Sequence, residues 1–284
     1  RRQRQMCIRD RSSPAVADLD RNNSLELIIG SHDGSLHILS GFGQQLATHQ
    51  VNGSINGSPA AVDLDQNGDL EVVFTSYNGS TGDVHAIHHD GSTFYGFPVY
   101  LNEKMVGGAA AGDLDGDGYP EIVVCTDDDN VYAIKKDGSI MSGFPFTSTD
   151  RFFNAPTLVD IDGDSDLEIV VGNRRGTLQV LHHDGTEMAS YEVGDDIRGG
   201  ISVADLNDDG SYELLFTGYD DMIHVWNPID GEELEGWPVD MESNSLTEPV
   251  TADLDNDGDL ELVTARKSGM AYVFHHDATP YNNF

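Results

Sequence analysis

The stretch Asp113-Leu114-Asp115-Gly116-Asp117-Gly118-Tyr119-Pro120-Glu121 decides the fold, because variants of it occur six times along the chain. Carboxylates stand at its positions 1, 3, 5 and 9, and glycine stands at position 6. The copies begin at Asp18, Asp63, Asp113, Asp160, Asp205 and Asp253, with steps of 45, 50, 47, 45 and 48 residues. One such cluster per period is typical of a propeller or a solenoid array. The repeat therefore predicts a single array of about six similar units.

The first unit, residues 13–51, shows the plan of every repeat. A short apolar strand at 14–17 (strand A) leads into the acidic loop, and strands B, C and D are expected at 25–30, 36–39 and 46–49. In later units strand D often opens with Gly-aromatic-Pro. Four short strands with tight turns in about 45 residues make one propeller blade. The sequence thus predicts an all-β fold, a β-propeller of about six four-stranded blades over residues 12–284.

The acidic loops carry oxygen ligands at a spacing that can surround one hard cation, and Ca²⁺ prefers six to eight oxygens. Side chains at positions 1, 3, 5 and 9 and the backbone carbonyl of position 7 are the predicted ligands of up to six Ca²⁺. They are Asp18, Asp20, Asn22, Ser24, Glu26; Asp63, Asp65, Asn67, Asp69, Glu71; Asp113, Asp115, Asp117, Tyr119, Glu121; Asp160, Asp162, Asp164, Asp166, Glu168; Asp205, Asn207, Asp209, Ser211, Glu213; and Asp253, Asp255, Asp257, Asp259, Glu261. An EF-hand is excluded, because position 12 is never acidic and no flanking helices are indicated. The alternative is that the loops are solvated acidic turns.

Position 6 of each loop requires a positive φ, which glycine supplies at 68, 118, 210 and 258. Asn23 can tolerate that conformation in the first loop. Ser165 is less suited, so the fourth loop is expected to be slightly strained.

Composition restricts the classes of partner. The formal charge of −35 argues against nucleic acid and anionic membranes as general partners, and no 18-residue apolar run exists that could span a membrane.

Cys125 lies in an apolar run and is expected to be a buried thiol. Residues 1–11 are basic and lack the repeat, so we interpret them as a foreign, adapter-derived extension. Both ends of the repeat array are expected to be truncated.

The repeats resemble the FG-GAP/VCBS repeats of secreted bacterial proteins, which are related to the propeller of integrin α chains. The resemblance covers residues 13–284 and rests mainly on the acidic loop between strands A and B. Gly57-Ser-Pro59, Gly108-Ala-Ala110 and Asn154-Ala-Pro156 match its "GAP" element, whereas the "FG" element is weak. The resemblance implies an extracellular, calcium-stabilised propeller used in adhesion or binding, and this chain could be part of a seven-bladed one.

Two other patterns allow more than one interpretation. The His-His-Asp sequences at 88–90, 182–184 and 275–277 could suggest zinc, but Lys135-Lys136-Asp137 stands at the same place in the third unit. We therefore interpret them as strand ends before turns. The aromatics of the Gly-aromatic-Pro segments are expected to pack between blades rather than to form a sugar-binding platform. No nucleophile elbow, phosphate-binding loop or catalytic dyad is evident.

Basic residues are concentrated in the D–A and B–C turns, which strand order places on the face opposite the acidic loops. This predicted ligand face, for an anionic protein or glycan, comprises Lys104, Arg151, Phe152, Arg174, Arg175, Arg198, Arg266 and Lys267. The alternative is that these charges only solubilise exposed turns.

These patterns predict a non-catalytic, calcium-binding propeller of a secreted or cell-surface protein, serving adhesion or recognition. An enzyme similar to calcium-containing rhamnogalacturonan lyases, or a scaffold beside a catalytic domain, are the alternatives. The sequence does not name the ligand.

Overall fold

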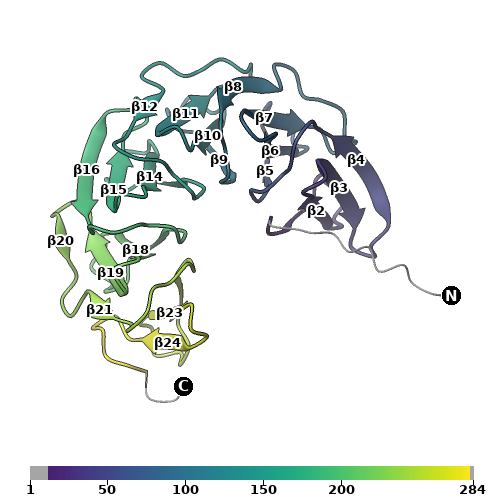
Figure 1. Ribbon diagram of the computed structural model, residues 1–284. Coiled ribbons are helices and arrows are strands. Elements are labelled where there is room, and N and C mark those ends of the chain that lie inside the picture. The colour runs from purple at the N-terminus through teal and green to yellow at the C-terminus, as the bar shows by residue number, and fades with distance from the viewer. Residues whose placement is uncertain (1–11, 282–284) are drawn as a thin grey trace. The chain divides into compact units, whose positions relative to one another are not determined.

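The computed structural model describes residues 12–281, which form only strands, turns and loops (Figure 1). Residues 1–11, interpreted as a foreign extension, lie outside the described residues. Contacts group the chain into two compact units, the first ending at Met141 and the second beginning at Ser142, except that Leu114–Gly116 belong to the second. In the described part of the chain, no helix is long and apolar enough to cross a membrane.

The first unit contains antiparallel sheets in the strand orders β1-β2-β3-β4, β5-β6-β7-β8 and β9-β10-β11. Their bounds are β1 (Ala15–Ala17), β2 (Glu26–Gly30), β3 (Ser35–Ser40), β4 (Gln45–Gln50), β5 (Ala60–Val62), β6 (Glu71–Tyr77), β7 (Gly82–Ile87), β8 (Val99–Glu103), β9 (Ala109–Gly112), β10 (Glu121–Cys125) and β11 (Asn130–Ile134). The predicted strands of the first repeat agree with β1 to β4 to within one residue at each end.

The second unit begins with the short strand β12 and contains the sheets β13-β14-β15-β16, β17-β18-β19-β20 and β22-β23-β24, with β21 also paired to β19. The bounds are β12 (Phe146–Thr147), β13 (Thr157–Val159), β14 (Glu168–Gly172), β15 (Thr177–Leu181), β16 (Glu187–Glu192), β17 (Ser202–Ala204), β18 (Glu213–Thr217), β19 (Met222–Asn227), β20 (Glu232–Glu233), β21 (Val239–Asp240), β22 (Val250–Ala252), β23 (Glu261–Ala265) and β24 (Ala271–Phe274). Both units therefore consist of propeller blades, and the predicted all-β propeller fold is confirmed.

The second strand of each blade carries most of the core. Every residue of β10, β14 and β18 is buried, so both faces of these strands are covered. Their sequences, such as Glu-Ile-Val-Val-Cys, are rich in β-branched residues, which suit a packed sheet. Cys125 is 4% exposed and burial raises the pKa of its thiol, which confirms the predicted buried cysteine.

The Gly-aromatic-Pro segments join neighbouring blades. Phe97 lies in one core cluster with Ile122 and Ile134 of the next blade, and the Trp237 indole N–H donates to the carbonyl of His276 at 2.9 Å. A Cβ on Gly96 would lie 2.4 Å from the carbonyl oxygen of Asp137. Only glycine permits this approach, and its φ is 91°. The predicted packing of these aromatics between blades is confirmed.

Candidate metal centres

The glutamate at position 9 attaches each acidic loop to the strand that follows it. It is the first residue of strand B and is at most 4% exposed in all six copies. In five of the loops its Oε2 accepts a hydrogen bond from the backbone N–H of position 2. The donor–acceptor pairs are Leu19–Glu26 (3.0 Å), Leu64–Glu71 (3.0 Å), Ile161–Glu168 (2.9 Å), Leu206–Glu213 (2.9 Å) and Leu254–Glu261 (2.8 Å). The buried carboxylate thus holds the start of the loop against strand B.

The aspartate at position 1 folds the rest of the loop around itself. In the first loop Asp18 accepts hydrogen bonds from the N–H groups of Asn22 (3.0 Å) and Asn23 (2.9 Å), and in the fifth Asp205 accepts from Asp209 (3.0 Å) and Gly210 (2.9 Å). In all six loops the N–H of position 7 donates to Oδ1 of position 5. The loop is therefore preformed by its own side chains.

Two positions of each loop have a positive φ. At position 6 the values run from 66° at Asn23 to 102° at Gly258, and Ser165 adopts 83°, as predicted. Position 4 is also left-handed in every copy, which the sequence analysis missed. Its residues are Arg21, Gln66, Gly116, Gly163, Asp208 and Asn256, with φ of 57°, 61°, 68°, 79°, 57° and 61°. The sequence signal of this conformation is that Gly116, Gly163 and Asn256, residues that tolerate a positive φ, stand at position 4 in three of the loops.

We expect Ser165→Gly to stabilise the protein by about 0.5–1 kcal/mol, because serine is strained at positive φ and glycine is not. Urea unfolding in the presence of calcium measures this difference. Ser211→Gly, at position 7 of the next loop and without a positive φ, is the matched control and should destabilise or leave stability unchanged. Equal effects of the two substitutions would contradict the strain.

The oxygen atoms of these loops fit a hard cation. Ligand atoms within 4.8 Å of one another are offered by Asp18, Asp20 and Glu26; by Asp63, Asp65 and Glu71; by Asp113, Asp115 and Glu121; by Asp160, Asp162 and Asp164; and by Asp162, Glu168 and His182. Among the described residues, buried Oδ1 of Asp63 and of Asp113 accept no hydrogen bond. Burial raises the pKa of Glu71, Glu168 and Glu213. A bound cation would give the unpaired oxygens a partner and would favour the charged form of the buried glutamates.

The histidine pairs contact the acidic loop of their own blade. His88, His182 and His275 place Nδ1 3.0, 3.4 and 3.1 Å from Oε1 of the position-9 glutamate. The following histidines, 89, 183 and 276, lie 3.8, 2.8 and 3.5 Å from the position-7 aspartates. The pairs end strand C, as interpreted, but the sequence analysis missed their contact with the loops. Lys135 and Asn227 contact the equivalent glutamates in their own blades.

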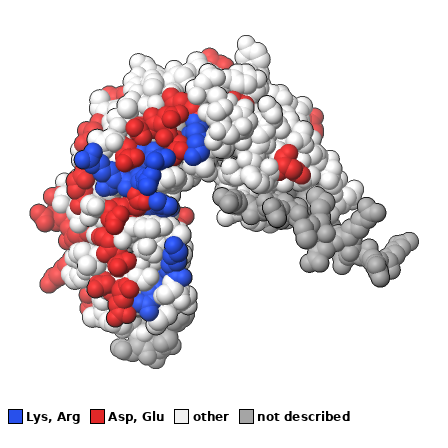
Figure 2. Space-filling view, viewed as in Figure 1, with Lys and Arg blue, Asp and Glu red and all other residues white. Residues whose placement is uncertain are grey.

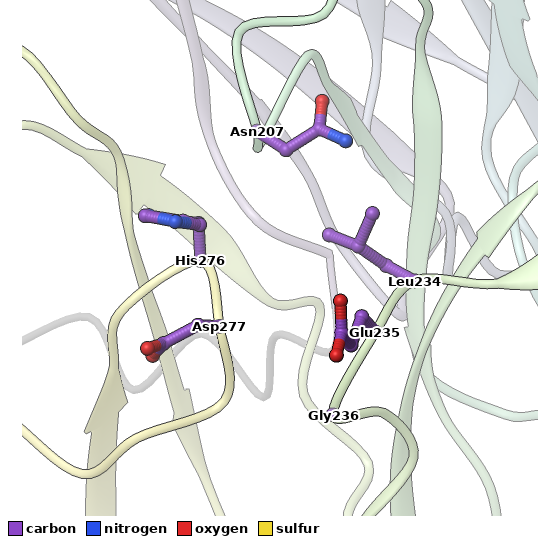
Figure 3. Close-up of a pocket in the computed structure, with 6 residues that line it drawn as sticks. All are labelled: Asn207, Leu234, Glu235, Gly236, His276 and Asp277. Atoms are coloured by element: carbon purple, nitrogen blue, oxygen red, sulfur yellow. The ribbon is translucent and has the colours of Figure 1, made fainter.

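A pocket of about 440 Å³ adjoins the fifth acidic loop (Figure 3). Asn207, at position 3 of that loop, and Leu234, Glu235 and Gly236 line it on one side. His276 and Asp277 from the turn after β24 line the other side. The predicted ligand Asn207 is therefore accessible from this pocket.

The residues of the predicted ligand face differ in exposure. Phe152 is 1% exposed, so its side chain lies beneath the surface and cannot contact a partner there. Arg266 donates to the carbonyl of Met241 at 2.7 Å and its side chain is 13% exposed. Lys104 is paired with Asp127. Figure 2 shows that Lys and Arg side chains are interspersed with Asp and Glu. Much of the positive charge is thus compensated locally.

Arg198 is held in place from several sides. Its guanidinium lies 4.9 Å from the ring centres of both Phe153 and Tyr219, and it donates to Oδ2 of Asp196 at 2.8 Å from Nε. Arg174 is 3.7 Å from the same carboxylate. By contrast, Arg175 and Lys267 are exposed and form no ion pair among the described residues. These two side chains remain available to an anionic partner.

Solved structures with this fold are many and distant in sequence. The chain is similar to BamB from Moraxella catarrhalis (TM-score 0.67, 15% identity, 94% of this chain and 73% of that chain). It is also similar to BBS1N, solved in complex with ARL6DN (TM-score 0.65, 13%, 93% and 79%). The V. cholerae biofilm matrix protein Bap1 matches with a TM-score of 0.63 and 22% identity over 85% of this chain and 41% of that chain. No curated protein sequence matches.

The sequence itself matches the FG-GAP-like repeat at residues 63–124, 113–171 and 205–264, which together span more than half of the chain. These segments begin at position 1 of the second, third and fifth acidic loops. Each ends within the strand that follows the next acidic loop, in β10, β14 and β23 respectively. The loop geometry and the sequence match thus identify the same repeat. The chain belongs to the FG-GAP-like repeat family.

Proposed function

We propose that this protein is a calcium-stabilised recognition module of a secreted or cell-surface bacterial protein, and that it binds a protein or glycan without catalysis. The observation that carries the calcium assignment is the repeated loop in which buried carboxylate oxygens, such as Oδ1 of Asp63, have no hydrogen-bond donor among the described residues. A divalent cation supplies the positively charged partner that such oxygens lack. Two similar structures support the recognition part of this proposal: BBS1N was solved in complex with a partner, ARL6DN, and Bap1 is a biofilm matrix protein.

Calcium would act on the architecture rather than on a substrate. Positions 1, 3 and 5 lie in the loop, whereas position 9 begins strand B, so one ion would join the loop to the sheet. A fixed A–B loop leaves the turns at the other ends of the strands as a rigid surface. The B–C turns that carry Arg175 and Lys267 belong to that surface.

The recognition part of this proposal is tested with anionic polymers. Arg175→Glu and Lys267→Glu, made together, should weaken binding to immobilised heparin or polygalacturonate by more than about tenfold, since two exposed charges are reversed. Lys136→Glu is the matched control, because its ammonium group lies over the Tyr119 ring beside an acidic loop. Binding that is the same for both variants, or no binding by the calcium-loaded wild type, would refute this partner class.

A further inference from the structure

A polar groove of about 400 Å³ lies between the outer strands of the first two blades. Its wall in the second blade is formed by Asp83 and His85 of β7 and by Pro98, Tyr100 and Asn102 around β8. The opposite wall comes from the end of β4 and includes His49 and Asn52. The volume falls within the range of small-molecule sites. None of the lining residues is Lys or Arg.

The carboxylate of Asp83 has no hydrogen-bond or ionic partner among the described residues, although desolvation by burial raises its pKa. At the same place in the first and fourth blades, Ser35 donates to Gln50 at 2.9 Å and Thr177 donates to Glu192 at 3.0 Å, each to its cross-strand partner. The cross-strand partner of Asp83 is instead Tyr100, which is 66% exposed. The second blade thus leaves a carboxylate and an aromatic ring open on one face of the sheet.

The second blade also has a longer B–C turn. His88 follows Glu71 by 17 residues, whereas His275 follows Glu261 by 14. The extra length forms the turn from which Asn78 and Thr81 line the groove. The pairing of β7 with β8 shifts register between Gly82 and Asp83, which places Tyr100 opposite Asp83. Turn length and register therefore both differ where the groove forms.

His85, which lines the groove, is held in place by its neighbours and is uncharged at neutral pH. The ring of His85 stacks on Phe74 at 4.9 Å and its Nε2 lies 2.9 Å from Oγ of Ser76. Burial, followed by the neighbouring His49, lowers the pKa of His85 to about 4. Nδ1 of His49 lies 3.0 Å from the carbonyl oxygen of Gly91, so Nδ1 carries the hydrogen of that bond.

We propose that this groove binds a neutral sugar residue. A pyranose presents an apolar C–H face and an edge of hydroxyl groups. The Tyr100 ring offers a flat surface for the face, the Asp83 carboxylate accepts hydrogen bonds from hydroxyl groups, and the amides of Asn52 and Asn102 both donate and accept. The side chains of these two asparagines make no hydrogen bond among the described residues, so their full capacity is available.

Other ligand classes fit less well. An anion would meet Asp83 and no cationic side chain. An organic cation would find one carboxylate and one aromatic ring rather than an aromatic cage. The groove lies in the first unit, apart from Arg175 and Lys267 of the second, so this proposal and the anionic-partner proposal stand or fall separately.

The test follows backbone amide signals of ¹⁵N-labelled, calcium-loaded protein during titration with methyl glycosides of glucose, galactose, mannose, fucose and N-acetylglucosamine. At least one glycoside should shift the signals of residues 82–85 and 99–102. Tyr100→Ala and Asp83→Asn should each weaken that binding by about tenfold, as expected for one stacking contact or one charged hydrogen bond. Tyr95→Ala is the matched control, because Tyr95 is 84% exposed in the same blade and does not line the groove.

Three results would overturn the assignment. The first is that no glycoside shifts these signals, and the second is that Tyr100→Ala and Asp83→Asn bind as the wild type does. The third is that choline, titrated in parallel, binds in the groove while no glycoside does. Arg175→Glu with Lys267→Glu should leave glycoside binding unchanged, which separates this site from the anionic-partner face.

Discussion

Removing calcium with excess chelator is expected to lower the melting temperature of the protein by at least about 10 °C. Each independent site with ligand at a hundredfold excess over its dissociation constant contributes about 2.7 kcal/mol, and folded domains have only about 5–15 kcal/mol in total. A shift of about 2–4 °C per kcal/mol is usual for chains of this size. Calorimetric melting in millimolar calcium and in chelator measures the difference. Equal melting temperatures would mean that the loops are solvated acidic turns.

The same experiment can be made specific to one loop. Glu213→Gln removes one ligand charge from the fifth loop but leaves an oxygen able to accept the N–H of Leu206. It should reduce the number of bound Ca²⁺ by one in a calorimetric titration, and its melting temperature should respond less to calcium. Glu232→Gln changes an exposed carboxylate of the same blade that lies outside the loop sequence and outside the adjoining pocket, and should leave both quantities unchanged. Equivalent stabilisation by Mg²⁺ would contradict the large, flexible coordination expected for calcium.

His224→Gln is expected to destabilise the protein by about 2–3 kcal/mol at neutral pH, because it leaves two largely buried carboxylates without their cation. Nε2 of His224 lies 3.0 Å from Oδ2 of Asp220, and Nδ1 lies 2.7 Å from Oε1 of Glu233. The side chains are 4%, 21% and 14% exposed, and the remaining exposure keeps the expected loss moderate. Urea unfolding at constant calcium measures it.

The pH dependence of stability identifies the charge as the cause. Burial alone would lower the pKa of His224, but the hydrogen bonds and charges of Asp220 and Glu233 outweigh it and raise the pKa to about 9. This folded-state value exceeds the ordinary 6.5, so the contribution is complete below pH 6.5 and is lost as the pH rises towards 9. Wild-type protein should therefore lose about 3 kcal/mol over this window, and His224→Gln should not.

His85 is the matched control at the equivalent position of the second blade. It stacks on Phe74 as His224 stacks on Phe216, but it has Ser76 in place of two carboxylates. Its lowered pKa of about 4 means that stability is lost as the pH falls from 6.5 towards 4. His85→Gln should thus flatten the acid side and leave the alkaline side unchanged. An alkaline change in His85→Gln as large as that in His224→Gln would contradict this explanation.

The acidic loops could be predicted because their chemistry is local. Nine residues contain the acidic side chains, the turn and the first residue of strand B, so spacing alone indicated that these carboxylates cluster and that Ser165 has a positive φ. At position 4, by contrast, Arg21 and Gln66 carry no sign of a left-handed conformation, and only comparison with Gly116 and Gly163 in the equivalent loops reveals it.

Features that depend on register between strands could not be predicted. His88 contacts Glu71 because β6 and β7 pair in one register, and a sequence does not state which residues face one another. Phe152 and Phe153 lie in the loop between β12 and β13, where Phe152 forms an isolated bridge with Asn173, and nothing in the sequence indicated that Phe152 would be the buried one. The opposition of Asp83 and Tyr100 depends on an irregularity in strand pairing, which has no sequence signature.

The contact between Gly96 and Asp137 has a consequence for protein engineering. The Gly-aromatic-Pro segment of one blade and the Asp-Gly turn of the next are shaped for each other, and the same contact joins Gly143 to Asp184 and Gly236 to Asp277. A chimaera that joins blades from different proteins would have to transfer both halves of this contact together. The exchangeable module of the chain therefore begins and ends inside blades, and a junction placed between blades would separate residues that need each other.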